Sequence, residues 1–133
     1  MARTPRDISD AQLAVLHQLW DLGPATIRQL TDALYPNGGT SSYATVQKLL
    51  ERLEDKHCVR RRRTGQAHTF EAILARDELI GRRLQAMAEK LCGGSLTPLL
   101  THLVRAKRLS AQERQDLRAL IDELDRKRQG ERR

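Results

Sequence analysis

The segment from residue 41 to residue 67 constrains the fold most, because a helical pattern gives way there to a strand pattern. Apolar residues first recur at the spacing i, i+3, i+4 and i+7, which is typical of a helix with one face on a core. A run of arginines follows, and Gly65, Gln66 and Ala67 then form a turn. The segment therefore predicts a basic β-hairpin after an amphipathic helix whose apolar stripe consists of Val46, Leu49, Leu50 and Leu53.

The helix face opposite this stripe carries short or hydrogen-bonding side chains, which suit contact with base edges in the major groove of DNA. A solvated face without a ligand is the alternative, and Arg52 suits either a phosphate or Asp55 on the same helix. The nearby arginines favour contact with phosphates. We therefore predict a surface for duplex DNA that consists of Ser42, Tyr43, Ala44, Thr45, Gln47, Lys48, Arg52, Arg60, Arg61, Arg62, Arg63 and Gln66.

The four consecutive arginines cannot all contact DNA, because side chains alternate between the two faces of a strand. Arg61 and Arg63 point one way, and Arg60 and Arg62 point the other. We expect at least one of them to be a solvated charge without a ligand.

The composition narrows the class of partner. The 133 residues include 24 Lys+Arg against 17 Asp+Glu, so the net charge is +7 and a polyanionic partner is favoured. Only 3% of the residues are aromatic, which argues against single-strand readers that stack bases on exposed rings. No apolar run approaches the roughly 20 residues of a membrane span, and the first residues lack the apolar core of a signal peptide. We expect a cytoplasmic protein without membrane insertion.

Two helices precede the DNA-contacting segment. The first begins near Ser9 and ends at residues 23–24, Gly-Pro; the second begins at Thr26 and ends before Pro36. At both starts a hydroxyl residue is followed three positions later by glutamine, which is the capping-box pattern.

The third helix should be capped by Ser42 and should end near His57, which then needs a positive φ. Two strands follow, at Val59–Thr64 and His68–Ala72. Helix, helix, helix, strand, strand is the order of a winged helix-turn-helix.

The C-terminal part predicts three further helices, which begin near Asp77, at a Ser95 cap and at a Ser110 capping box, before a frayed charged tail over 126–133. We expect a DNA-binding domain over residues 1–75 and a helical domain over 76–133. The short helices have little to bury against within one chain, so a second copy is the simplest partner. Their dimerisation residues would be Leu84, Met87, Leu91, Leu96, Leu99, Leu100, Leu103, Val104, Leu117, Leu120, Ile121 and Leu124.

These motifs resemble the penicillinase-repressor (BlaI/MecI/CopY) family of bacterial transcription repressors. The resemblance rests on Ile8–Leu16 with Trp20, on Tyr43–Glu54, and most specifically on Gly93–Leu100 and Leu117–Leu124. It implies a mainly α fold with a small β-wing: an N-terminal winged helix-turn-helix and a C-terminal three-helix dimerisation domain. It also implies a homodimeric repressor on an inverted-repeat operator.

Many members of this family are inactivated when a membrane sensor peptidase pathway triggers proteolysis in the dimerisation domain. By position, the cleaved bond corresponds to His102-Leu103. The chain departs from the family at that bond and at His57, where glycine is usual. It also lacks cysteine over 125–133, so the copper-binding tail is absent.

No set of residues in the sequence predicts catalysis, a cofactor or a metal. Paired carboxylates, a Ser/His/Asp order and a phosphate-binding glycine loop are not recognisable, and the histidines lack the spacing of metal ligands. Cys58 occupies an apolar position, which favours a buried thiol over a redox sensor. Two other functions stay open: a duplex nucleic-acid binder without sequence preference, and a protein-interaction module for an acidic partner.

Overall fold

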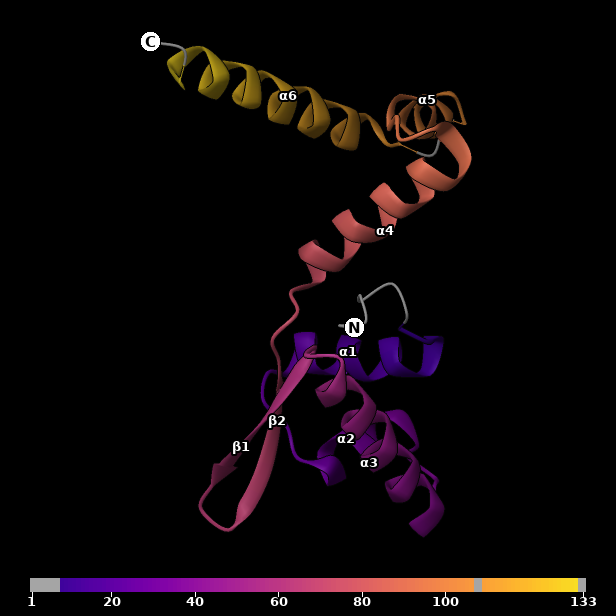
Figure 1. The fold of residues 1–133 in the computed structure, drawn as a ribbon, viewed down its shortest axis with the longest axis vertical. Helices are drawn as coiled ribbons and strands as arrows, with labels where there is room; N and C mark the ends of the chain where they lie inside the picture. The colour runs from indigo at the N-terminus through magenta and orange to yellow at the C-terminus, as the bar shows by residue number, and fades with distance from the viewer. Residues whose placement is uncertain (1–7, 107–108, 132–133) are drawn as a thin grey trace. The chain divides into compact units, whose positions relative to one another are not determined.

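The computed structural model describes residues 8–106 and 109–131, and the described chain is mainly helical with one two-stranded antiparallel sheet (Figure 1). Contacts divide it between Ala86 and Met87 into two compact units. The elements in chain order are α1 (Asp10–Leu22), α2 (Ile27–Leu34), α3 (Thr40–Asp55), β1 (Val59–Thr64), β2 (Ala67–Ala72), α4 (Arg76–Cys92), α5 (Thr97–Arg105) and α6 (Ala111–Glu131).

The starts of α1 and α2 confirm the two predicted capping boxes. The Ser9 hydroxyl accepts from the Gln12 amide at 3.1 Å, and Gln12 Oε1 accepts from the Ser9 amide at 3.2 Å. Thr26 and Gln29 repeat the exchange at 3.1 and 2.8 Å. Each pair satisfies two amide donors that the first helical turn leaves free.

The start of α3 differs from the prediction that Ser42 is its N-cap. The helix begins at Thr40, its N-cap is Gly39, and no side chain caps it. The Ser42 amide donates to the Gly39 carbonyl at 3.0 Å. The Ser42 side chain instead lies over Gly38, where a Cβ would meet its hydroxyl oxygen at 2.1 Å. The residue is thus already inside the helix and is used to pack the preceding turn.

The end of α3 confirms the predicted positive φ at His57, which is 60°. The Cys58 amide donates to the Leu53 carbonyl at 2.9 Å, and the His57 amide donates to the Glu54 carbonyl at 3.0 Å. This pair of bonds is the Schellman motif, in which the residue after the C-cap adopts the left-handed conformation.

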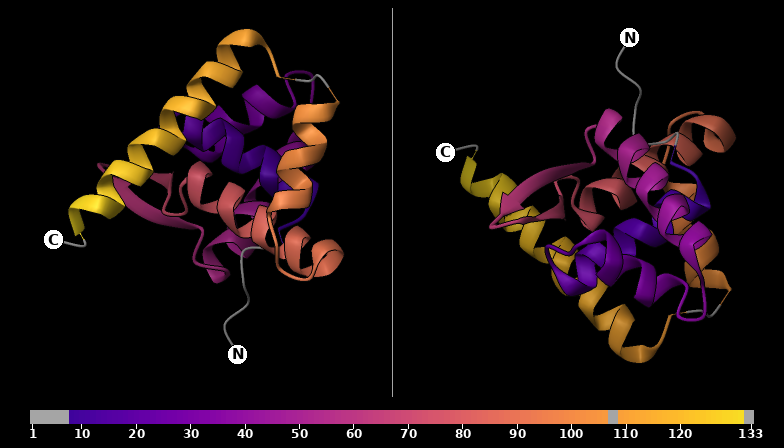
Figure 2. Two further views of the ribbon diagram at one scale, coloured as in Figure 1. Left: turned by 90° about the horizontal axis from the view of Figure 1, so that it is seen from above. Right: turned by 90° about the horizontal axis from the view of Figure 1, so that it is seen from below.

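The hairpin of β1 and β2 follows directly. Thr64 pairs with Ala67, so the turn is Gly65-Gln66, and β2 begins one position before the predicted His68. Gly65 has φ 66°, a conformation that glycine adopts without steric cost. On its other side β2 bonds to Ala25: the Ala25 and Phe70 amides each donate to the other residue's carbonyl, at 3.0 and 2.8 Å. Figure 2 shows this hairpin and α1–α3 from two further directions.

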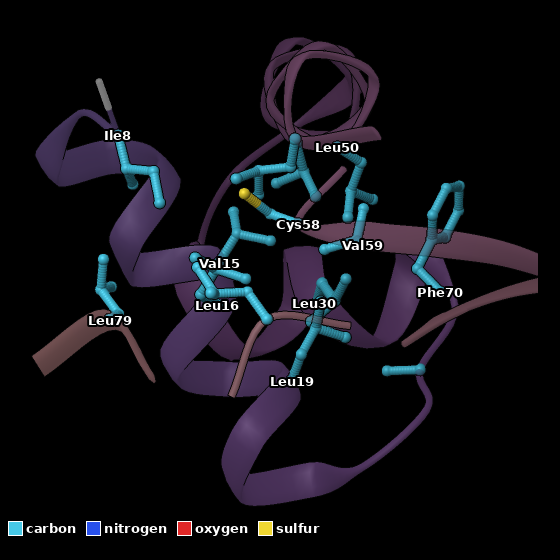
Figure 3. Packing of buried hydrophobic residues seen from close by; sticks show 14 residues of the cluster. Ile8, Val15, Leu16, Leu19, Leu30, Leu50, Cys58, Val59, Phe70 and Leu79 are labelled. Atoms are coloured by element: carbon cyan, nitrogen blue, oxygen red, sulfur yellow. The ribbon is translucent and has the colours of Figure 1, made fainter. Parts of the chain in front are cut away.

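One hydrophobic core holds the first unit together (Figure 3). It continues past the hairpin into α4, because Leu74 and Leu79 are 5% and 4% exposed. The Trp20 indole N–H donates to the Leu74 carbonyl at 2.9 Å, and Arg83 donates to the Ile8 carbonyl at 3.1 Å. The first turns of α4 therefore belong to this core, and Arg76 of α4 also lies 3.0 Å from Asp21 of α1. The buried cluster comprises Ile8, Val15, Leu16, Leu19, Ala25, Leu30, Val46, Leu50, Leu53, Cys58, Val59, Phe70, Leu74 and Leu79.

In the second unit, the prediction that Ser95 caps α5 is wrong. The N-cap is Leu96, without a side-chain bond, and the Ser95 amide donates to the Cys92 carbonyl at 3.1 Å. Ser95 thus belongs to the turn formed by Gly93 and Gly94, whose φ angles are 59° and 95°. Pro98 lies in the first turn of α5, as predicted.

The start of α6 confirms the predicted Ser110 capping box, because Ser110 and Glu113 exchange bonds of 3.1 and 3.0 Å. Its end differs from the prediction of a frayed tail, since the helix continues to Glu131; residues 132–133 lie outside the described part. Arginine, lysine and glutamine are good helix formers, and Lys127 Nζ lies 4.0 Å from a Glu123 oxygen one turn away. None of the described helices is long and apolar enough to cross a membrane.

Candidate nucleic-acid interface

α3 presents the predicted polar face to solvent. On its opposite stripe Val46, Leu50 and Leu53 are 0% exposed, so the helix is fixed on the core. Leu49 is half-buried at the edge of the core. Of the predicted contact residues on this helix, Ser42 is half-buried and the others are exposed: Tyr43, Ala44, Thr45, Gln47, Lys48 and Arg52.

The polar side chains on this face differ in what they already bind. The Thr45 hydroxyl donates to the Ser41 carbonyl at 2.9 Å, so its oxygen remains an acceptor toward solvent. In the described part of the chain, the side chains of Gln47, Lys48 and Arg52 have no hydrogen-bond or ion-pair partner, and Arg52 forms no pair with Asp55. Three long polar side chains are therefore free to meet a ligand.

The hairpin register confirms that the arginines alternate. Arg61 lies opposite Phe70 and Arg63 opposite His68, while Arg60 lies opposite Glu71. Directly paired residues share a face of an antiparallel sheet. One face thus carries Arg61 and Arg63, and the other carries Arg60 and Arg62.

Two carboxylates that the sequence analysis did not consider bind three of these arginines. Glu71 accepts from Arg60 and lies 3.6 Å from Arg62. Glu54, on α3, accepts from Arg61 at 3.2 Å. The register of a hairpin with a two-residue turn places Arg60 opposite Glu71, so this pair was in principle visible in the sequence.

A hollow of about 710 Å³ lies between the start of α2, the turn before α3 and the end of the hairpin. Two of the predicted contact residues line this hollow: Tyr43, on α3, and Gln66, in the hairpin turn. The hollow is also lined by side chains that the sequence analysis did not predict as DNA contacts: Thr26, Arg28, Asp32, Thr40 and His68.

The family model for the penicillinase repressor matches residues 8–123. The chain belongs to this family. It is 35% identical over 127 residues to "Transcriptional regulator BlaI" from two strains of Mycobacterium tuberculosis, a match that covers 94% of this chain and 89% of that protein. It is 20% identical over 127 residues to "Penicillinase repressor" from Staphylococcus aureus, which covers 96% of this chain and all of the other. This is a family of transcription repressors and not of enzymes.

In this member of the penicillinase-repressor family, the bond His102-Leu103 lies inside α5, and both side chains are exposed. A peptidase binds its substrate in an extended conformation, so α5 has to open locally before that bond can be cut. The structure thus places the two residues on the surface but in a helical conformation.

The remaining candidate groups do not form a chemical site. Among residues 8–106 and 109–131, no three His, Cys, Asp or Glu side chains gather as metal ligands do. Cys58 is 1% exposed, and burial raises the pKa of its thiol, while the charges of Lys56 and Arg82 act in the opposite direction. A buried thiol with a raised pKa forms little reactive thiolate, which suits the packing role predicted for Cys58.

Proposed function

We propose that this protein is a cytoplasmic, homodimeric, sequence-specific repressor whose α1–β2 segment is a winged helix-turn-helix with α3 in the major groove of duplex DNA. The observation that carries this proposal is the two-sided character of α3. One stripe has Val46, Leu50 and Leu53 at 0% exposed, and the opposite face offers Gln47, Lys48 and Arg52 without partners in the described chain.

Each group on this face suits a particular DNA contact. Gln47 can both donate to and accept from adenine in the major groove, and the Ala44 methyl suits the methyl group of thymine. Lys48 and Arg52 suit phosphates, which supply most of the affinity. Tyr43, Ser42 and the hairpin turn at Gln66 would flank the groove.

The homodimer is proposed from the apolar side chains that the described α5 and α6 leave exposed. Neither helix has a buried residue, and Leu100, Ile121 and Leu124 are 49%, 50% and 53% exposed. Full burial of a leucine is worth about 1.5–3 kcal/mol, so pairing several across a dimer offsets the cost of association. The proposed interface comprises Leu84, Met87, Leu91, Leu96, Leu99, Leu100, Leu103, Val104, Leu117, Leu120, Ile121 and Leu124.

A two-fold dimer presents two equal reading helices, so its operator would be an inverted repeat with half-sites spaced in steps of about 10 bp. Induction would then act through loss of the dimer. A cut between Gly94 and Arg108, including one at His102-Leu103, separates the dimerisation helices from the reading helix. A membrane sensor pathway that activates a peptidase is the proposed source of the cut.

Gel shifts against its own promoter and a scrambled duplex of equal length test this function. We expect clear preference for the promoter, and a loss of about 1–3 kcal/mol of binding free energy for Gln47→Ala if Gln47 makes a bidentate base contact. Gln129→Ala, at an exposed position near the end of α6, is the matched control and should bind like the native protein.

The same titrations separate the two alternative functions. Equal affinity for both duplexes would indicate a nucleic-acid binder without sequence preference. Absence of salt-sensitive DNA binding would indicate a module for an acidic protein partner.

A further inference from the structure

The four arginines of β1 differ in the negative charge that surrounds them. Glu71 binds Arg60 and approaches Arg62, and Glu54 binds Arg61. Arg63 has no carboxylate within ion-pair distance in the described part of the chain. A continuous basic run in the sequence thus becomes three paired cations and one unpaired cation.

Glu71 lies close enough to pair with both arginines on its face of the hairpin, Arg60 and Arg62. Its side chain is only 18% exposed, whereas those of Arg60 and Arg62 are 60% and 61% exposed. A DNA phosphate that approaches either guanidinium meets the carboxylate next to it and must compete with it. The two arginines therefore bring less net attraction to a phosphate than their number suggests.

Arg61 serves a different purpose, because it joins the hairpin to α3. One of its terminal nitrogens lies 3.2 Å from Glu54 on α3, and its guanidinium carbon lies 5.1 Å from the centre of the Phe70 ring. Phe70 itself is 1% exposed. Arg61 is thus held between a helix carboxylate and a core ring, and it orients the hairpin relative to α3.

Arg63 lies on the side of the hairpin that borders α3. It is paired directly with His68 and shares its face of the sheet. His68 lines the 710 Å³ hollow together with Thr40 and Tyr43 at the start of α3. The one unpaired arginine of the described hairpin therefore lies on the same face as Arg61, the face that Arg61 joins to the proposed reading helix.

We propose that Glu71 withholds Arg60 and Arg62 from nucleic acid, so that Arg63 is the phosphate contact of the hairpin. This inference rests on the proposed DNA-binding function and adds a residue that sets the affinity. Glu71 is a positioning residue: it acts through the arginines and does not itself touch the DNA.

The test measures the affinity of the full chain for one promoter duplex at several salt concentrations. Each phosphate contact contributes about −0.9 to the slope of log affinity against log salt. Arg63→Ala should reduce the size of this slope by about 1 for each hairpin on the DNA. Arg60→Ala and Arg62→Ala should reduce it by clearly less, although they remove the same charge.

Glu71→Gln provides the complementary measurement. It should tighten binding and steepen the salt dependence, because it releases Arg60 and Arg62 to phosphates. In the Glu71→Gln background, Arg60→Ala should then weaken binding more than it does in the native chain. Glu89→Gln is the matched control: it removes one exposed negative charge from α4 that pairs with no hairpin arginine in the described chain, and it should leave the slope unchanged.

Two results would overturn the proposal: equal slope losses for the three arginine variants, or unchanged affinity for Glu71→Gln at unchanged thermal stability. If Glu71→Gln fails to fold, the comparison of the arginine variants still decides. A native protein that binds no DNA would instead refute the proposed function, and the two failures are thereby distinguished.

Discussion

Replacing His57 by glycine tests the account of how α3 ends. The residue has φ 60°, and its side chain is exposed without a hydrogen-bond partner in the described chain. For a residue with a Cβ, the left-handed conformation costs about 1–2 kcal/mol, which glycine avoids. Glycine also makes the unfolded chain more flexible, which costs about 0.4–1 kcal/mol. The expected net effect of His57→Gly is therefore a gain of about 0–1.5 kcal/mol in the free energy of unfolding.

Urea unfolding followed by circular dichroism measures this difference, at one protein concentration so that dimerisation does not enter the comparison. An unchanged slope with denaturant would show that the same surface is exposed on unfolding. His57→Ala is the matched control, because it removes the imidazole and keeps the strained Cβ. We expect its stability to stay within about 0.5 kcal/mol of the native chain.

A loss of more than about 1 kcal/mol in His57→Gly would refute this reasoning. If His57→Ala showed the same loss, the imidazole would make a stabilising contact. If His57→Ala were neutral, the backbone argument itself would be wrong.

Three further changes test the fold. Leu79→Ala should lower the free energy of unfolding in urea by about 2–5 kcal/mol, because Leu79 fills the first core. For the same reason, a fragment ending at residue 86 should melt at a higher temperature than one ending at 76. The raised pKa of Cys58 stabilises the fold below the unfolded thiol's pKa of about 8.5. That contribution should be lost as pH rises through the folded pKa, and Cys58→Ala should show a smaller alkaline loss. Ser9→Ala should cost about 0.5–2 kcal/mol through loss of the α1 cap, again measured in urea.

The helix starts show which local predictions succeed. Ser9, Thr26 and Ser110 are each followed three residues later by glutamine or glutamate, and each forms a reciprocal pair with it. Ser42 and Ser95 lack this partner, because Thr45 and Pro98 occupy the position. Gly39 is the N-cap of α3 and Leu96 that of α5, and neither forms the side-chain cap bond that a sequence pattern can reveal.

The candidate site was predicted in outline, since the polar face of α3 and the alternation of the arginines follow from regular periodicity. Glu54 was missed because a charge run in the sequence does not show which carboxylates fold back onto it. Glu71 was missed because the turn was predicted over three residues, Gly65 to Ala67, which shifts the register by one position and moves Glu71 away from Arg60. The continuation of the first core into α4 was also missed. Leu79 and Arg83 resemble the residues of any amphipathic helix, and only the burial of Leu79 in the first core and the bond from Arg83 to the Ile8 carbonyl assign them to the first unit.

The position of β1 in the sheet has a consequence for solubility. β2 is bonded on both sides, to β1 and to Ala25, whereas β1 pairs only with β2 among the described strands. An edge strand offers free backbone donors and acceptors to another chain, and charged side chains oppose such pairing. If a second β1 approached this edge, its arginines would face those of the first. The four arginines of β1 thus protect the chain from strand-to-strand aggregation, and Arg60 and Arg62 contribute to this protection even though Glu71 keeps them from DNA. Variants that replace several of these arginines with apolar residues should aggregate whatever their affinity for DNA.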